Sequence, residues 1–172
     1  DINTWDVSLI TDMSELFRNK YDFNDDISEW DVSSVITMGN LFRSSNFNSD
    51  ISSWDVSSVT EMYGMFQDVA SFNQDISSWD FPNAWNLGGL FNSATDFNQD
   101  ISGWDVSGVT RMEYMFNNYV DDYGQSSFNQ DLSSWDVSNV TNMADMFCRS
   151  AFSGDLSSWD VSSVTTMNRM FM

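Results

Sequence analysis

One stretch of this chain is written seven times, and that repetition limits the possible folds more than any other feature. The copy Asp50–Asn73 reads D-I-S-S-W-D-V-S-S-V-T-E-M-Y-G-M-F-Q-D-V-A-S-F-N. The copies open at aspartates spaced by 25, 24, 25, 25, 31 and 24 residues: Asp1, Asp26, Asp50, Asp75, Asp100, Asp131 and Asp155. Self-similarity at such a period is typical of solenoids, in which each repeat contacts its neighbours. We therefore expect one repeat domain over residues 1–172, with coils 1–25, 26–49, 50–74, 75–99, 100–130, 131–154 and a partial coil 155–172.

Each copy combines two patterns of apolar residues. In the third copy, apolar and polar residues alternate over 53–57, which predicts a short half-buried strand. Apolar residues over 59–66 follow at spacings of 3, 3 and 1, which predicts a short helix with Thr60 as its N-cap. The wider pattern, I-x-x-W-x-V-x-x-V, parallels the frame of leucine-rich repeats. We therefore predict an α/β solenoid, leucine-rich-repeat-like and right-handed, with one short parallel strand and one short helix per coil of about 25 residues.

The aromatic residues recur in register and predict columns in the core between stacked coils. The Trp column is Trp5, Trp30, Trp54, Trp79, Trp104, Trp135 and Trp159. The first Phe column is Phe17, Phe42, Phe66, Phe91, Phe116, Phe147 and Phe171, and the second is Phe23, Phe47, Phe72, Phe97, Phe128 and Phe152. A platform for stacking a ligand is the alternative to core packing.

The charge of the chain restricts its partners. With 26 acidic residues, six basic residues and no histidine, the formal net charge is −20. This balance disfavours nucleic acid and anionic membrane surfaces, and it suits cations or a basic partner. The single cysteine, Cys148, excludes an internal disulfide, and no apolar run is long enough for a transmembrane helix. Because the sequence has no histidine, no nucleophile elbow and no phosphate-binding glycine loop, we expect no enzyme.

Two columns of aspartates carry 14 of the 26 acidic residues. One column opens the copies, and the other follows each Trp: Asp6, Asp31, Asp55, Asp80, Asp105, Asp136 and Asp160. Three explanations are open for so many like charges in register. The carboxylates accept hydrogen bonds in local Asx turns, bind Ca²⁺ as hard oxygen ligands, or contact a basic partner. We expect the partner-binding surface on the column beside Trp, and Ca²⁺ is the only cofactor that we consider.

The fifth copy is six residues longer than the common period of 25. A further set of candidate partner-binding residues lies in this insertion: Tyr119, Asp121, Asp122 and Tyr123. An insertion in one repeat is expected to project as a loop, and such loops often carry recognition, although loop growth is also tolerated without function. Asn139 begins the only N-x-[ST] sequon, which makes it a candidate glycosylation site in a protein secreted by a eukaryote.

The string W-D-V-S-x-V-T-x-M-x-x-M-F, followed by F-N-Q-D-I-S, resembles the repeats of the BspA-like leucine-rich-repeat surface proteins. The match extends over essentially the whole chain. The resemblance implies a secreted or cell-surface protein that acts in adhesion or protein contacts, commonly as part of a larger protein. It does not imply an enzyme.

We therefore expect a non-enzymatic extracellular or cell-surface protein that mediates adhesion or protein–protein interaction. Its partner would be a protein, an extracellular-matrix or surface ligand, or a second copy of itself. The alternative is a structural subunit of an extracellular filament or wall layer, built by end-to-end stacking. Both ends of the sequence fall inside the repeat and no secretory leader is visible, so we expect residues 1–172 to be a segment of a longer chain.

Overall fold

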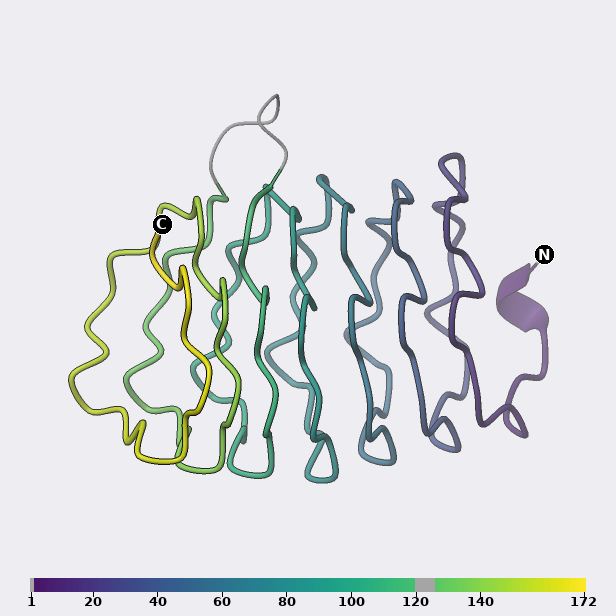
Figure 1. Cartoon of the computed structure of the whole chain (residues 1–172). Helices are drawn as coiled ribbons and strands as arrows, with labels where there is room; N and C mark the ends of the chain where they lie inside the picture. Colours follow the sequence, from purple (N-terminus) through teal and green to yellow (C-terminus); the bar gives the residue numbers. More distant parts are fainter. Residues whose placement is uncertain (1, 120–125) are drawn as a thin grey trace.

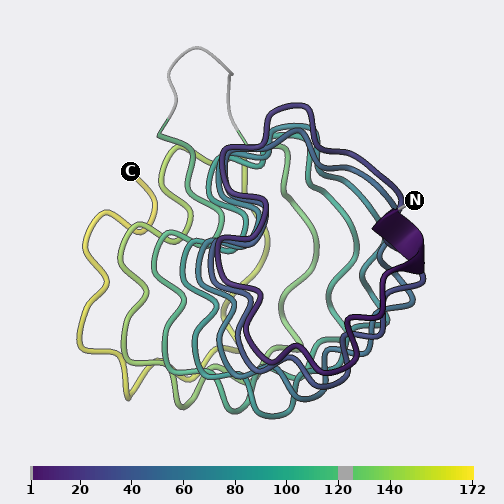
Figure 2. The same cartoon turned by 90° about the vertical axis from the view of Figure 1, so that its right-hand side faces the viewer.

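The computed structural model describes residues 2–119 and 126–172. In Figure 1 the chain winds through successive coils, which stack side by side from the N-terminal to the C-terminal end. Figure 2, turned by 90°, shows that the coils follow closely similar paths. Backbone hydrogen bonds join neighbouring coils, as from Met38 N to Glu61 O at 3.0 Å. Below, positions are counted from the Trp of each coil, so that position 10 of the third coil is Gly64.

Regular secondary structure is nearly absent from this stack. The described residues contain one 3₁₀-helix, η1 (Ile2–Thr4), and no α-helix or β-strand. Parallel bridges join position 7 of neighbouring coils, as Glu61 to Asn86, but they remain isolated. The predicted α/β, leucine-rich-repeat-like solenoid is therefore wrong, because no coil has the strand or the helix that it requires. Tight turns make up the coils instead.

Asx turns replace the predicted strand. Asp50 Oδ1 accepts a hydrogen bond from the N–H of Ser52 at 2.9 Å, and Asp55 Oδ1 accepts one from the N–H of Ser57 at 3.0 Å. Side-chain acceptors of this kind compete with a strand ladder for the same N–H groups. The alternation over 53–57 therefore arises from turns that direct alternate side chains inward, and no sheet forms there.

Overlapping turns replace the predicted helix. The N–H of Met65 donates to Met62 O at 3.1 Å, and the N–H of Gln67 donates to Gly64 O at 3.0 Å, three residues back in each case. Gly64 and Asp68, at positions 10 and 14, are left-handed with φ of 63° and 61°. In this segment, pairs of side chains that face the core alternate with pairs that face outward. This period of four resembles helical spacing, which explains the wrong prediction.

Alternate N–H groups of the same segment form a ladder between coils. From the third coil to the fourth, the N–H groups at positions 8, 10, 12 and 14 donate to the C=O groups at positions 7, 9, 11 and 13, at 2.8–3.1 Å. Every bond of this ladder points from the earlier coil to the later one. Thr60, predicted as an N-cap, instead donates through its N and its Oγ1 to Ile36 O of the preceding coil, at 2.8 and 3.2 Å. The backbone therefore sets the register of the stack.

Each Trp after the first binds its coil to the preceding one. Trp54 Nε1 donates to Ile27 O, and Trp104 Nε1 donates to Ile76 O, both at 3.1 Å. The same bond recurs at Trp30, Trp79, Trp135 and Trp159. These six rings are buried, so the prediction of a Trp column in the core is confirmed for them. Trp5 has no preceding coil among the described residues, and its ring is 62% exposed.

The two Phe columns pack beside the Trp column. Within the third coil, the rings of Phe66 and Phe72 stack with their centroids 3.8 Å apart, and Phe66 also stacks on Phe91 of the next coil at 5.8 Å. An aromatic pair of this kind contributes about 0.5–1.5 kcal/mol beyond the burial of its surface. The columns lie in the core along most of the stack, whereas Phe171 in the last coil is 64% exposed.

Trp104→Ala is expected to lower the free energy of unfolding by about 3–5 kcal/mol, because it removes a buried ring and the bond from its indole to Ile76 O. Urea melts followed by circular dichroism measure the loss. Trp5→Ala is the matched control, since this ring is largely exposed, and it should cost about 0.5 kcal/mol or less. Equal losses in the two variants would show that the Trp column does not hold the coils together.

Candidate functional site

The side chains at positions 9, 10, 13 and 14 of the coils point away from the core, and none of those described belongs to the hydrophobic core cluster. We call these side chains the variable face. Its members are Ser14, Glu15, Arg18, Asn19, Gly39, Asn40, Arg43, Ser44, Tyr63, Gly64, Gln67, Asp68, Gly88, Gly89, Asn92, Ser93, Glu113, Tyr114, Asn117, Asn118, Ala144, Asp145, Cys148, Arg149, Asn168, Arg169 and Met172. The inter-coil ladder forms the backbone beneath them.

The seven copies differ strongly from one another on this face. Position 10 holds Glu15, Asn40, Gly64, Gly89, Tyr114, Asp145 and Arg169 in turn. Position 1, by contrast, is an aspartate in all seven copies. All residues at position 10 share a left-handed backbone, with φ between 53° and 63°. The same backbone thus presents a different side chain in nearly every coil, which is the arrangement of a recognition surface on a repeated scaffold.

Cations and tyrosines gather in the segment that carries this face. The six basic residues of the chain lie 7–15 residues after a Trp: Arg18, Lys20, Arg43, Arg111, Arg149 and Arg169. The described tyrosines lie 9–16 residues after a Trp: Tyr21, Tyr63, Tyr114 and Tyr119. The fifth, Tyr123, lies outside the described residues. The Asp columns are on the other segment of each coil, so the positive charges are separated from most of the negative ones.

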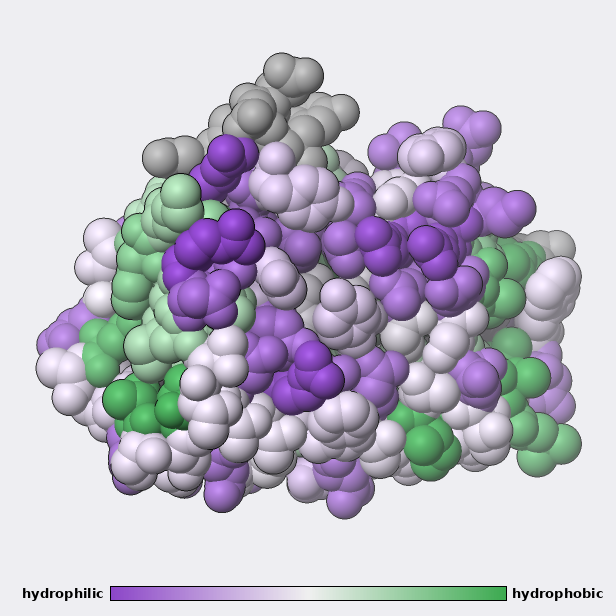
Figure 3. All heavy atoms as spheres, in the orientation of Figure 1, coloured by the Kyte–Doolittle hydropathy of each residue, from purple (hydrophilic) through white to green (hydrophobic). Residues whose placement is uncertain are grey.

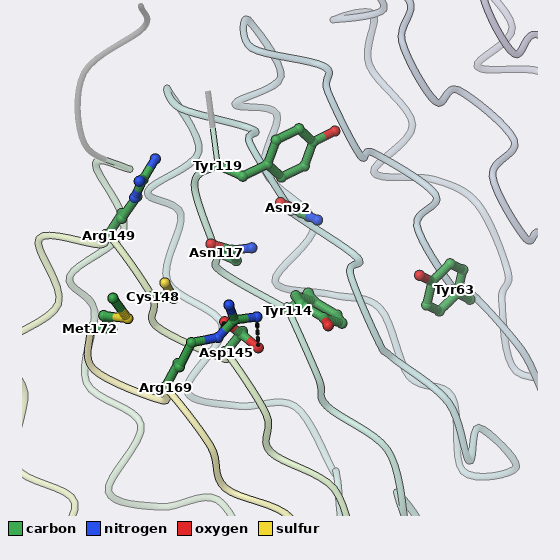
Figure 4. Close-up of a pocket in the computed structure, with 10 residues that line it drawn as sticks. All are labelled: Tyr63, Asn92, Tyr114, Asn117, Tyr119, Asp145, Cys148, Arg149, Arg169 and Met172. Atoms are coloured by element: carbon green, nitrogen blue, oxygen red, sulfur yellow. Dashed lines mark hydrogen bonds and ion pairs between the residues drawn. The ribbon is translucent and has the colours of Figure 1, made fainter. Parts of the chain in front are cut away.

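A pocket opens on the variable face, over the third to the seventh coil (Figure 4). Its volume is about 450 Å³, which lies within the range of small-molecule sites. It is lined by Tyr63, Asn92, Tyr114, Asn117, Tyr119, Asp145, Cys148, Arg149, Arg169 and Met172. We call it the face pocket. Elsewhere, Figure 3 shows apolar side chains mainly at the two ends of the stack, where Leu9 and Phe171 are exposed.

Two acidic side chains are buried on the variable face against arginines. Asp145 is 2% exposed, and its carboxylate binds Arg169 in bidentate fashion, with Nε to Oδ1 at 2.9 Å and Nη2 to Oδ2 at 3.1 Å. Glu113 accepts from Arg111 Nε at 2.9 Å. The hydrogen bond to each carboxylate raises the pKa of its arginine above the ordinary value. A buried carboxylate without such a partner would be strongly destabilising, so both arginines are fixed in place.

Tyr119 connects the start of the insertion to the third coil. Its hydroxyl donates to Asp68 Oδ1 at 2.6 Å and accepts from Gln67 Nε2 at 3.2 Å. Partial burial, and then the bond to Asp68, raise the pKa of Tyr119 above its ordinary value. The tyrosine therefore spans the fourth coil and forms one wall of the face pocket.

The predicted site residues lie in two separate places. Tyr119 lines the face pocket, while Asp121, Asp122 and Tyr123 lie outside the described residues. In the column beside Trp, the N–H of the serine two residues later donates to the carboxylate at 2.9–3.1 Å in Asp6, Asp31, Asp55, Asp105, Asp136 and Asp160. In the column that opens the copies, the same bond occurs in Asp26, Asp50, Asp75, Asp100, Asp131 and Asp155. All of these aspartates are distant in the coil from the variable face.

Local hydrogen bonds therefore explain how so many aspartates of like charge can lie in register along the stack. Bonds from the hydroxyl and the N–H of Ser57 hold the pKa of Asp55 below its ordinary value, and Asp31 is lowered in the same way by Ser33. The neighbouring carboxylates act on Asp31 in the opposite direction but more weakly. Among the described residues, no group of three or more Asp, Glu, His or Cys side chains is arranged to hold a metal ion.

Asp80 is the exception in its column. The residue two places later is Pro82, which has no N–H to donate to the Asp80 carboxylate. Asn139, the candidate glycosylation site, is exposed, and its Nδ2 donates to Ser107 O of the preceding coil at 2.9 Å.

The pocket residues Asn117, Asp145 and Arg169 are absent from the sites predicted from sequence. Asp145 and Arg169 each occur once at position 10, and asparagine occurs at position 13 only in the fourth and fifth coils, so a search for repeated chemistry passes over them. The informative signal lies instead in the positions that vary between copies, because arginine and tyrosine are concentrated there. Aligning the copies on Trp reveals it.

Stability is expected to fall in acid. The folded pKa values of the turn aspartates are lowered, so their contribution is fully present above the unfolded value of about 3.9 and is lost as pH falls through the folded values. Thermal melts between pH 7 and 2 should show Asp55→Asn less stable than the parent at pH 7 and equal to it at pH 2. Asp80→Asn is the control and should match the parent throughout, since Pro82 offers no N–H. A deficit in Asp55→Asn that persists at pH 2 would contradict this account.

No helix among the described residues is long and apolar enough to cross a membrane. No curated protein and no solved structure matches the chain. The model of a family described as "Mycoplasma protein of unknown function, DUF285" matches residues 1–88, 42–123 and 122–172. These overlapping segments cover the sequence from end to end, as a repeat family would. The chain therefore belongs to the DUF285 family of Mycoplasma proteins of unknown function.

Proposed function

We propose that this chain is a non-enzymatic binding protein of the cell surface or the extracellular space, and that it binds its partner through the variable face. One observation supports the proposal above all: the basic residues and the described tyrosines collect on the segment that differs between copies. Tyrosine and arginine are enriched among the residues that dominate binding energy at interfaces. A chain of net charge −20 has no general reason to place its six cations there.

The separation of the residues that join neighbouring coils from those of the variable face supports the same proposal. The turn aspartates, the Trp indoles and the Phe columns are used in holding coils together. We place the partner site on the variable face rather than on the aspartates beside Trp, because one oxygen of most of those carboxylates is already bound in a turn. The resemblance of the repeat to BspA-like surface proteins favours adhesion as the biological setting.

The test is retention of the fluorescently labelled chain on cultured cells and on cell-derived matrix. A face variant combines Tyr63→Gly and Tyr114→Gly, because glycine already occupies positions 9 and 10 at Gly88, Gly64 and Gly89. We expect it to lose at least tenfold in retention with an unchanged melting temperature. The control combines Asp31→Asn and Asp105→Asn on the uniform segment, and should be retained like the parent. Retention of the face variant, or loss confined to the control, would exclude the variable face.

End-to-end stacking is a second candidate, and the polarity of the ladder favours it. The C=O groups at positions 7 to 13 of the first coil accept no bond of the ladder from the described residues, and at the opposite end the N–H groups at positions 8, 10 and 12 of the last coil donate to no backbone carbonyl of the described residues. Exposed apolar side chains surround both ends, including Leu9 at 90% and Phe171 at 64%. A further coil of the same repeat, or the opposite end of a second copy, fits either surface.

Sedimentation velocity of the 172-residue chain tests self-stacking. If copies join, the sedimentation coefficient should rise with concentration, and Phe171→Asp should abolish the rise because a charge then faces the apolar end of the next copy. The exposed Tyr21→Ser is a control. A concentration-independent monomer would remove this candidate.

A further inference from the structure

We propose that the face pocket binds a saccharide unit, with tyrosine rings against the apolar face of the sugar and fixed planar polar groups bound to its hydroxyls. This inference rests on the proposed function, since it names the class of ligand held by the variable face. Four features of the pocket carry it: its aromatic lining, an unpartnered amide, a fixed guanidinium and its charge.

The aromatic lining comes from two coils. Tyr63 is on the third coil, while Tyr114 and Tyr119 are on the fifth, and all three line the pocket, with Tyr63 apart from the other two in Figure 4. The face of an aromatic ring carries partial negative charge and attracts polarised C–H groups, which a pyranose ring presents on one side. Tyr114 is half-buried and Tyr119 is held by Asp68, so two of the rings are restrained before a ligand arrives.

Asn117 supplies a polar group without a partner. Its side chain is 5% exposed and lines the pocket, and its Oδ1 has no hydrogen-bond partner among the described residues. An unpaired buried acceptor destabilises the folded protein, and a hydroxyl donor from a ligand would offset that cost. The torsion that turns an asparagine amide is broad, so the amide can rotate to present this oxygen to the pocket. The residue is thus poised for a donor that the protein does not supply.

Arg169 supplies donors in a fixed orientation. Asp145 uses its Nε and Nη2, so the planar guanidinium is held by two bonds while other N–H groups remain to be shared with a ligand. The amide of Asn92, on the fourth coil, adds a donor and an acceptor to the lining of the pocket. Vicinal hydroxyls of a sugar both donate and accept, and they match such an alternation of planar groups better than a purely anionic or purely apolar ligand does.

The charge around the face pocket determines which kind of saccharide is favoured. Asp145 neutralises Arg169, and although Arg149 also lines the pocket, the chain as a whole carries a net charge of −20, which repels anions at long range. We therefore expect neutral sugars to bind more tightly than acidic ones.

The repeat itself offers variants that leave the backbone intact. Tyr114 has a φ of 60°, a left-handed conformation that glycine adopts at Gly64 and Gly89 in the same position of earlier coils. Tyr114→Gly therefore removes a ring and relieves backbone strain together. Ser58→Gly is the control, because it lies outside the variable face at position 4, where glycine already occurs at Gly108. Asn117→Ala removes an acceptor that is unpartnered in the free protein, so its melting temperature should not fall by more than the loss of a few side-chain contacts.

The experiment is saturation-transfer NMR, followed by calorimetry, of the full 172-residue chain with five methyl glycosides: glucose, galactose, mannose, N-acetylglucosamine and N-acetylneuraminic acid. We expect at least one neutral glycoside to bind. Tyr114→Gly and Asn117→Ala should each weaken that binding at least tenfold, while Ser58→Gly leaves it unchanged. The melting temperature of each variant, measured in parallel, separates lost binding from lost folding.

Three results would overturn the assignment. The first is the absence of binding by all five glycosides while the face variant still loses retention on cells, which would leave the proposed function in place and remove the saccharide. The second is glycoside binding that survives both pocket variants, which would place the sugar elsewhere on the chain. Cell retention that none of the glycosides reduces as a competitor would likewise remove the saccharide and point to a protein partner on the same face.

Discussion

The stack depends on how the backbone N–H groups are divided within one segment of each coil. Alternate N–H groups close turns to a carbonyl three residues back, and those between them donate to the next coil. Left-handed residues at positions 10 and 14, such as Gly64 and Asp68, make this division possible. Between the ends of the stack, most backbone N–H and C=O groups of the segment are thereby hydrogen-bonded without a helix or a strand, as a buried backbone requires. The rest of the coil, including the Trp bond to the preceding carbonyl, adds to a register already set by this ladder.

This division also determines what the side chains of the segment are free to do. Because inward side chains alternate with outward ones, Met62 and Phe66 belong to the hydrophobic core while Tyr63 and Gln67 lie outside it, and Gln67 is itself buried and donates to Tyr119. The outward pairs need only tolerate a left-handed backbone at one member. Glycine and asparagine do so readily, whereas Tyr114 and Arg169 adopt it at a cost of order 1 kcal/mol. Strained residues that line a pocket are consistent with selection for binding rather than for folding.

The sequence predicted the order of the stack better than its local conformation. The period and the aromatic columns follow from spacing alone, and the burial of Trp54 and Phe66 agrees with them. The strand and the helix do not follow, because the Asx turn at Asp55 and the left-handed residue at Gly64 produce the same apolar spacings by a different backbone. The periodicity of a sequence indicates which side chains are buried, but several backbone conformations can bury the same set of side chains. The face pocket was beyond reach for another reason: Tyr63 and Asp145 are brought together across three coils, and no spacing within one copy encodes that proximity.

Since every coil meets its neighbour through the same ladder, coils are interchangeable parts. Loss or duplication of a whole coil, as happens when repeated DNA recombines out of register, would preserve each backbone junction. It would nevertheless change which side chains are adjacent on the variable face. Removing the fourth coil, for example, would bring Gly64 next to Tyr114, and both residues would keep their places in the inter-coil ladder. A population of such genes could therefore vary its binding pockets by changing coil number alone, without a single point mutation and without risk to the core.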